Sequence, residues 1–251
     1  VDANGGLHIN AGSAVANRIT EYKNVFSTIA DPDINVALVV EGVKKAYPSA
    51  KTIAFLTANQ PIGEQLPSIV KALEGAGFTV VSNDKYDQKA VDLTPQLSKV
   101  KSLNPDVLFL GWTVADTALP IKTAKQISAA KNLYAWATSC DQVQPEIGST
   151  DIKYVGNLLT GVDINAPTTE LAKSYVAKYK TYIASSPHQS PSNTQNMYAS
   201  LFWADSLFVV AKAMEAAGTT TDVAKITEQM LKTRVEAVQG PGYGFSAKKL
   251  G

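Results

Sequence analysis

The chain has 251 residues, of which 45% are hydrophobic, and it carries 23 basic against 22 acidic side chains. This length and composition allow one or two apolar cores. The even charge balance, without a long run of either sign, argues against a nucleic-acid surface or a basic membrane-binding helix. The longest apolar run, from Leu201 to Val210, contains Asp205 and is too short to span a bilayer.

The pattern of residues 1–29 is typical of the middle of a fold rather than of its beginning. Residues 6–10 are expected to end a strand, residues 11–14 to form a turn of small residues, and residues 20–28 to return as an extended segment. A fold does not usually start with one short strand and a turn, so we expect preceding sequence to be missing. The chain starts with Val1 rather than methionine and shows no signal peptide, and we expect it to be processed, trimmed or a fragment. The single cysteine, Cys140, allows no internal disulfide, which fits a cytosolic protein and also a bacterial periplasmic one.

A helix follows, with Asp33 as its expected N-cap and Pro48 after its end. Its inward face is apolar and consists of Val36, Val39, Val40 and Val43.

Residues 51–112 are the centre of the predicted fold, because apolar strands and amphipathic helices alternate there. The expected order is strand, helix, strand, helix and strand, at residues 52–57, 66–74, 78–82, 94–103 and 106–111. This alternation is typical of a parallel sheet with right-handed crossovers. Ligands bind beyond the carboxyl ends of such strands, so residues 59–62 and 111–116 are the first places to expect a site.

The ends of the two central helices also have sequence signals. Gly75 and Gly77 are expected to end the first, because glycine readily adopts the left-handed conformation. Asp92 or Thr94 is expected to cap the second, with Asn104-Pro105 after its end and one apolar face. That face consists of Leu97, Val100 and Leu103.

The remaining elements continue the pattern and then become mainly helical. A helix at 115–129 contains Pro120, which predicts a later start or a kink. The other expected elements are strands at 133–138 and 154–162, a short helix at 144–147, and helices at 169–185, 198–217 and up to about residue 232, the last capped by Asp222. Residues 240–245 are expected to form a glycine-rich loop or an edge strand.

Two domains are predicted from this order. Residues 29–164 form an α/β domain, and residues 1–28 with 165–251 form the other, although the final segment alternatively returns to the α/β domain. A chain that crosses between domains more than once leaves a cleft for a ligand at the crossings.

The sequence lacks the usual catalytic and metal-binding motifs. It contains no HExxH, no GxSxG and no phosphate-binding glycine loop, and Gly240-Pro-Gly-Tyr-Gly244 neither follows a buried strand nor opens a helix. His8 and His188 have no Asp or Cys at ligand spacing, and Cys140 has no nearby histidine. We therefore expect no enzyme activity, no cofactor and no metal.

Four stretches, in the same order, resemble the type I periplasmic solute-binding proteins of the branched-chain amino acid ABC transporter family. They are residues 9–13 with 25–28, residues 53–77, residues 92–111 and residues 197–218. Within them, Ile62-Gly63 stands where the family often has Tyr-Gly, Asn104-Pro-Asp-Val-Leu-Phe-Leu-Gly111 resembles a family strand, and Ala213-Met-Glu-Ala-Ala-Gly218 resembles a family helix end.

This resemblance implies a two-lobed α/β fold of Rossmann-like parallel sheets flanked by helices, with one lobe incomplete. It implies a periplasmic or membrane-anchored extracellular component of an ABC importer that binds a small carboxylate, an amino acid or an aromatic acid. The ligand would be held by hinge closure, with hinges near residues 29–33 and 163–167, and delivered to a membrane permease.

The resemblance also carries over ligand contacts at eight positions. Gly12, Ser13 and Ala14 match a small-residue turn whose N–H groups and hydroxyl hold a carboxylate, in agreement with the preference of such donors for anions. Ser13 alternatively only completes a turn. Ile62 makes an apolar contact where the family has tyrosine.

The other contacts follow the next strands. Trp112 and Thr113 match a ligand-facing position, although a tryptophan there is equally compatible with the core. The family's acid for a ligand ammonium corresponds to Asp141, displaced by one position, or is replaced by Cys140. Together with Ile62 and Trp112, this replacement would favour a more apolar acid, for example an aromatic one. The alternative hypotheses for the function are a ligand-sensing regulator with the same fold and a nucleotide-dependent α/β enzyme.

Overall fold

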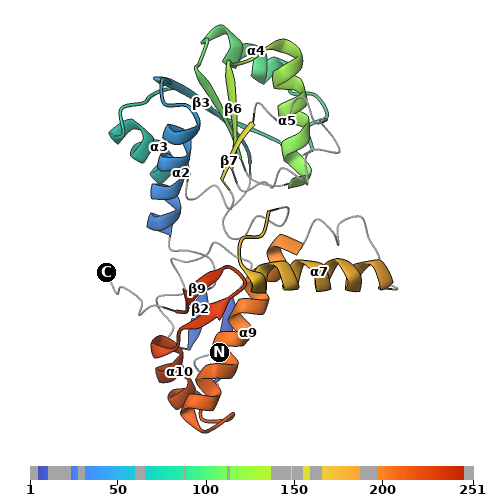
Figure 1. Ribbon diagram of the computed structural model, residues 1–251. Coiled ribbons are helices and arrows are strands. Elements are labelled where there is room, and N and C mark those ends of the chain that lie inside the picture. Colours follow the sequence, from blue (N-terminus) through green and yellow to red (C-terminus); the bar gives the residue numbers. More distant parts are fainter. Residues whose placement is uncertain are drawn as a thin grey trace. The chain divides into compact units, whose positions relative to one another are not determined.

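The computed structural model describes residues 5–10, 24–27, 32–59, 66–87, 89–111, 114–136, 148, 155–158, 166–186 and 197–245 (Figure 1). The chain forms two compact units: Pro32–Thr160, and Val1–Asp31 together with Gly161–Gly251. Each unit contains apolar clusters of its own.

The unit 32–160 is built on a five-stranded sheet in the order β4-β3-β5-β6-β7, and every pairing in it is parallel. Its strands are β3 (Thr52–Ala58), β4 (Thr79–Tyr86), β5 (Val107–Gly111), β6 (Asn132–Trp136) and β7 (Val155–Leu158). The described helices of this unit are α2 (Pro32–Ala46), α3 (Leu66–Gly75), α4 (Thr94–Ser102) and α5 (Val114–Ile127) (Figure 1). The predicted α/β class with a parallel sheet is confirmed.

Helices cover both faces of this sheet, which explains why β3 after its first residue and the whole of β5 are buried and mainly apolar. On one face, Val39 and Val43 of α2 and Leu73 of α3 pack against alternate strand residues. On the other face, residues of α4 and α5 such as Leu97 and Ile121 pack against the intervening ones. The predicted inward face of α2 is confirmed, with Val39 and Val43 fully buried.

The face beneath α2 and α3 has an aromatic row across its three central strands. Phe109 lies in the middle of this row, with its ring centroid 4.8 Å from that of Phe55 and 5.6 Å from that of Tyr134. Trp136 lies 6.2 Å from Phe109 by the same measure. Such rings bury large areas, so this row makes a major contribution to the core.

Strand β4 is longer than the sequence predicts. The prediction ended it at Ser82, because Asn83, Asp84 and Lys85 are polar, yet the strand continues to Tyr86 and pairs with β3 along that length. As an edge strand, β4 tolerates polar residues on its less covered side, and charges there discourage pairing with another sheet.

The helix ends both agree and disagree with the predictions. Asp222 and Thr169 cap α10 and α7, accepting from Lys225 N at 3.1 Å and Ala172 N at 3.1 Å. The predicted cap Asp33 is wrong, because α2 already begins at Pro32, a residue suited to a first turn.

The cap residues of helix α4 also differ from the prediction. Its N-cap is Leu93, without a side-chain cap, while Asp92 accepts from Thr94 N at 2.8 Å just before the helix. Leu103 is the C-cap and is 42% exposed, so its predicted place on the buried face is wrong. Asn104 takes the left-handed conformation with φ 47°, and Pro105 follows, which together end the helix as predicted.

Helix α5 contains Pro120 in its interior, so the alternative that the helix begins after this proline is wrong. The predicted short helix at 144–147 lies outside the described residues.

The other unit combines a parallel pair of strands, β1 (His8–Asn10) and β2 (Val25–Ser27), with an antiparallel hairpin, β8 (Val235–Ala237) and β9 (Gly240–Tyr243). The sequence did not predict β8. The described helices of this unit are α7 (Glu170–Ser185), α9 (Met197–Ala217) and α10 (Val223–Lys232). One cluster joins Phe26 of β2 to α9 and α10, and a smaller cluster joins α7 to α9.

Within the described part of the chain, no helix has the length and apolar character of a membrane span.

Candidate functional site

The eight positions predicted to contact a ligand all lie outside the residues that the structure describes. They are Gly12, Ser13, Ala14, Ile62, Trp112, Thr113, Cys140 and Asp141. The described strands nevertheless locate the points in the chain from which five of these positions follow.

Those points lie along one edge of the sheet in the unit 32–160. Ala58, Gly111 and Trp136 are the last residues of β3, β5 and β6, three strands that are adjacent and parallel. In the sequence, Ile62 comes after the first, Trp112 directly after the second, and Cys140 after the third. The predicted contacts of this unit therefore begin at neighbouring carboxyl ends.

The strand order adds a reason to consider this edge. The chain passes from β3 outward to β4, and then returns across β3 to β5, so the order reverses between β3 and β5. Crevices at such a reversal are the common ligand sites of open α/β sheets.

Three side-chain positions form a row at this edge, on the face that α2 and α3 cover. Thr57 pairs in register with Gly111, and Gly111 pairs with Trp136. A Cβ placed on Gly111 would lie 3.5 Å from Cγ2 of Thr57 and 4.0 Å from the Trp136 ring. Thr57 is 1% exposed, and its hydroxyl oxygen is buried without a hydrogen-bond partner.

At the opposite edge, where the same strands begin, one carboxylate accepts hydrogen bonds from several segments. Asp106 precedes β5 and accepts from Lys51 N at 2.9 Å, Thr52 N at 3.1 Å and Thr52 Oγ1 at 3.1 Å. Its second oxygen accepts from Lys131 Nζ at 3.1 Å. The backbone N–H donors of Lys51 and Thr52, followed by the Lys131 ammonium, hold the pKa of this carboxyl well below its usual range. Asp106 thus connects the starts of β3 and β5 and the segment before β6.

Another carboxylate, that of Asp205 in α9, has a structural role in the other unit. It is fully buried and accepts from Val238 N at 2.7 Å, Gln239 N at 3.0 Å and Gln239 Nε2 at 3.1 Å. These bonds attach α9 to the turn between β8 and β9. Burial, and then the charge of Asp205, raise the pKa of Tyr243. The sequence showed Asp205 only as an interruption of an apolar run, and its partners could not be predicted from spacing.

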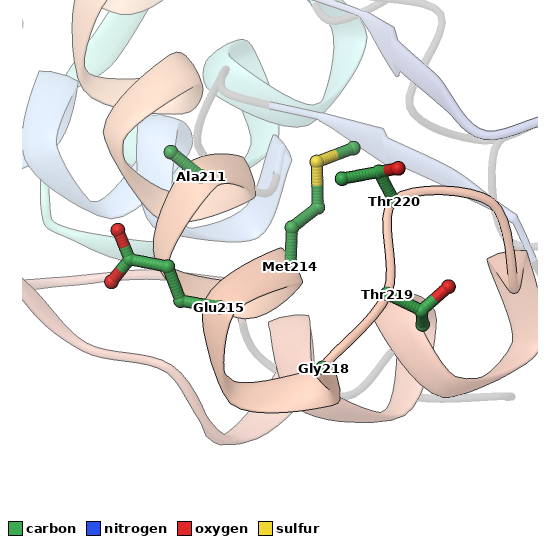
Figure 2. Close-up of a pocket in the computed structure, with 6 residues that line it drawn as sticks. All are labelled: Ala211, Met214, Glu215, Gly218, Thr219 and Thr220. Atoms are coloured by element: carbon green, nitrogen blue, oxygen red, sulfur yellow. The ribbon is translucent and has the colours of Figure 1, made fainter.

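A hollow of about 550 Å³ lies at the C-terminal end of α9 (Figure 2). In Figure 2 the side chain of Met214 extends toward Thr220, and that of Glu215 points away from both. The residues that line the hollow are Ala211, Met214, Glu215, Gly218, Thr219 and Thr220. They include a carboxylate and no cation, and the hydroxyl of Thr219 already accepts from Thr221 N and Asp222 N. The chemistry of this hollow does not suit a carboxylate ligand.

Among the described residues, no group of three or more His, Cys, Asp or Glu side chains is arranged to hold a metal ion. His8 lies on β1 and is exposed, whereas His188 and Cys140 lie outside the described residues.

A family model described as "Periplasmic binding protein" matches residues 1–249 of the chain. A leucine-binding protein from Thermotoga maritima superimposes with a TM-score of 0.72 at 21% identity, over 96% of this chain and 66% of that chain. A type 1 periplasmic binding protein from Bordetella pertussis gives 0.75 at 20% identity, over 98% of this chain and 68% of that chain.

A third similar structure is a solute-binding protein of an ABC transporter from Rhodopseudomonas palustris, solved in complex with 3,4-dihydroxybenzoic acid. Its TM-score is 0.70 at 17% identity, over 96% of this chain and 64% of that chain. The present chain thus spans about two thirds of the length of these structures.

Proposed function

This chain belongs to the periplasmic binding protein family, and we propose that it is the extracytoplasmic solute-binding component of an ABC importer. The resemblance read from four stretches of the sequence is confirmed by the match over residues 1–249. The observation that supports the proposal is that β3, β5 and β6 are adjacent parallel strands, and that the segments predicted to contact a ligand follow their carboxyl ends in the sequence.

The proposed ligand is a small carboxylate, either an amino acid or an aromatic acid. Two of the similar structures are named for complexes with 3,4-dihydroxybenzoic acid and 4-hydroxybenzoate, and another is named as a leucine-binding protein. All three ligands carry a carboxylate, which is the chemistry they share. The family and these neighbours are solute-binding receptors rather than enzymes, which supports binding without turnover.

We assign the contacts as the sequence predicted them. The turn Gly12-Ser13-Ala14 would hold the carboxylate through N–H groups and a hydroxyl. Ile62, Trp112 and Thr113 would contact the body of the ligand.

Asp141 or Cys140 would face the other end of the ligand. A carboxylate there suits the ammonium of an amino acid, whereas a thiol suits an aromatic acid without one. Closure about a hinge would complete the site. A membrane permease as the partner, and a periplasmic or membrane-anchored location, belong to the same proposal.

Binding can be tested with isothermal titration calorimetry and thermal unfolding of the purified chain against leucine, valine, 4-hydroxybenzoate and 3,4-dihydroxybenzoate. A ligand that binds only the native state raises Tm by mass action. Saturable one-to-one binding of a hydroxybenzoate, without binding of leucine, assigns an aromatic acid. Binding of leucine that Asp141→Asn abolishes assigns an amino acid and makes Asp141 its ammonium partner. Absence of binding by all four compounds would overturn the proposal.

A further inference from the structure

Helix α9 is apolar on the side that faces solvent as well as on the side that faces the core. Val209 and Ala213 are fully buried, whereas Trp203 is 50% exposed, Leu207 is 66% exposed and Phe208 is also exposed. A helix that is apolar all round is normally buried on every side. Among the described residues nothing covers the outer side of α9, so this side is a candidate interaction surface.

The outer side of α9 has the residue spacing of a helix that packs against one other helix. Four apolar residues, which we call the outer stripe, follow one another at intervals of four, three and four positions: Trp203, Leu207, Val210 and Met214. This is the a/d repeat of paired helices. A helix that lies on a membrane surface would carry several basic residues beside its apolar stripe, and α9 has only Lys212. The pattern therefore indicates a helical partner.

The hollow at the C-terminal end of α9 continues the outer stripe. Ala211, Met214 and Gly218 line it on the helix side (Figure 2). Met214 follows Trp203 by about three helical turns, so the hollow lies on the same side of α9 as the Trp203 ring, roughly 16 Å further along the axis. One side of one helix thus carries both an exposed indole ring and a hollow of about 550 Å³.

We propose that the outer stripe of α9 binds α9 of a second copy of this chain in antiparallel orientation, with Trp203 of each copy in the hollow of the other. A two-fold pairing centred on the stripe sets Trp203 opposite Met214, and Leu207 opposite Val210. Such an interface is self-complementary, because each copy supplies one ring and one hollow. The inference goes beyond the proposed function and does not depend on it.

The chemistry of the hollow suits an indole ring. Met214 supplies a polarisable thioether, which contacts aromatic rings favourably, and its side chain extends toward Thr220 (Figure 2). An indole N–H is a donor only and needs an acceptor when it is buried. Glu215 lines the hollow and supplies carboxylate oxygens.

The charges of α9 favour the antiparallel orientation. Lys212 and Glu215, its two exposed charged residues, form an ion pair with each other at 2.7 Å near the C-terminal end of the helix. In an antiparallel pair these ends lie apart, and the Glu215 carboxylate of each copy lies toward the N-terminal half of the other helix, where the helix dipole is positive. A parallel pair would bring like charges of the two copies together.

The exposed apolar area sets the expected strength of the dimer. Trp203, Leu207 and Phe208 together leave roughly 300 Å² of apolar surface on each copy. Two such surfaces bury less than the about 1,600 Å² of a standard stable interface. We therefore expect a weak dimer, with a dissociation constant of about 10 to 100 µM.

Sedimentation velocity of the purified, ligand-free chain tests the dimer at concentrations from about 5 to about 500 µM, which bracket this range. Leu207→Glu places a charge in the outer stripe and Trp203→Ala removes the ring, and each should raise the dissociation constant more than about tenfold. Tyr182→Glu is the matched control, because Tyr182 on α7 is also 66% exposed. It should stay within about twofold of the wild type, and all three variants should keep Tm within a few degrees.

Disulfide cross-linking tests the orientation. In a Cys140→Ser background, chains with Leu207→Cys are mixed with chains with Val210→Cys and oxidised. Antiparallel pairing sets these two positions opposite each other in different copies, so disulfides between the two kinds of chain should exceed disulfides between like chains.

Four results would overturn the inference. A wild type that stays monomeric at about 500 µM removes the dimer. A monomer in which the emission lost on Trp203→Phe is that of a buried indole shows that another segment of the same chain covers the outer stripe. A dimer that Leu207→Glu leaves intact uses a different surface, and disulfides between like chains alone show parallel pairing. The proposed function is tested separately, by the calorimetry with carboxylates.

Discussion

The two edges of the parallel sheet in the unit 32–160 are built in opposite ways. At the edge where the strands begin, the carboxylate of Asp106 accepts four hydrogen bonds from three residues. At the edge where they end, the described residues of the three central strands are uncharged, and Thr57 keeps an unpartnered hydroxyl. Asp106 therefore fixes the edge where the strands begin, whereas the segments predicted to contact a ligand follow the opposite edge in the sequence.

The largest effect should come from the aromatic row that lies between these edges. Phe109→Ala removes the central ring of this row from a fully buried position. We expect the free energy of unfolding to fall by about 3 to 5 kcal/mol, from lost burial and the cavity that remains. Urea unfolding followed by circular dichroism measures this.

The control for this substitution is Leu103→Ala, since Leu103 is 42% exposed. It should change the free energy of unfolding by less than about 0.5 kcal/mol. Equal losses in the two variants would contradict the placement of Phe109 in the core.

The next effect tests the edge where the strands begin. Asp106→Ala leaves the N–H groups of Lys51 and Thr52 without their acceptor, so we expect a loss of about 2 to 3 kcal/mol in the free energy of unfolding. Ligand affinity should not change, because this edge is remote from the strand ends. Glu170→Ala, which breaks an exposed ion pair with Lys173, should cost under about 1 kcal/mol. A weakened ligand affinity in Asp106→Ala would argue against the division of roles between the edges.

The same carboxylate predicts a dependence of stability on pH. Its pKa is lowered in the folded chain, so its contribution is complete above the unfolded pKa of about 4 and is lost as pH falls toward the folded value. The difference in unfolding free energy between the wild type and Asp106→Asn should therefore be constant from pH 7 to 5 and shrink below about pH 4. Denaturant unfolding at pH 7, 5 and 3 measures it. A difference that is the same at pH 3 as at pH 7 would show that the charge of Asp106 does not matter.

The smallest effect concerns the edge where the strands end. A Cβ on Gly111 meets its neighbours at ordinary contact distances of 3.5 to 4.0 Å, so Gly111→Ala should change the unfolding free energy by less than about 1 kcal/mol. By contrast, a Cβ on Gly244 would overlap the carbonyl oxygen of Thr233, and Gly244→Ala should destabilise its unit clearly. Thermal unfolding compares the two. A large loss in Gly111→Ala would show that this edge is as tightly packed as the core.

Much of the fold could be predicted because its signals are local. The strands β3, β5 and β6 were recognisable as short apolar runs, and Asp222 as a cap preceding an amphipathic segment. Strand β4 was predicted too short, because Asn83, Asp84 and Lys85 are polar and only the pairing with β3 shows that they belong to a strand. The predicted contacts were located relative to strand ends, but Thr57 was read only as part of an apolar run.

The sequence by itself determined the alternation of strands and helices, and through it the parallel sheet and the edge where a site is expected. Hydrophobic periodicity carries that information within a few residues. The tertiary structure decided which polar groups find partners. Asp106 meets Lys51 across 55 positions of the chain, Asp205 meets Gln239 across 34, and the hydroxyl of Thr57 meets none. Hydrogen bonds between distant segments depend on how those segments pack, and no local pattern encodes them.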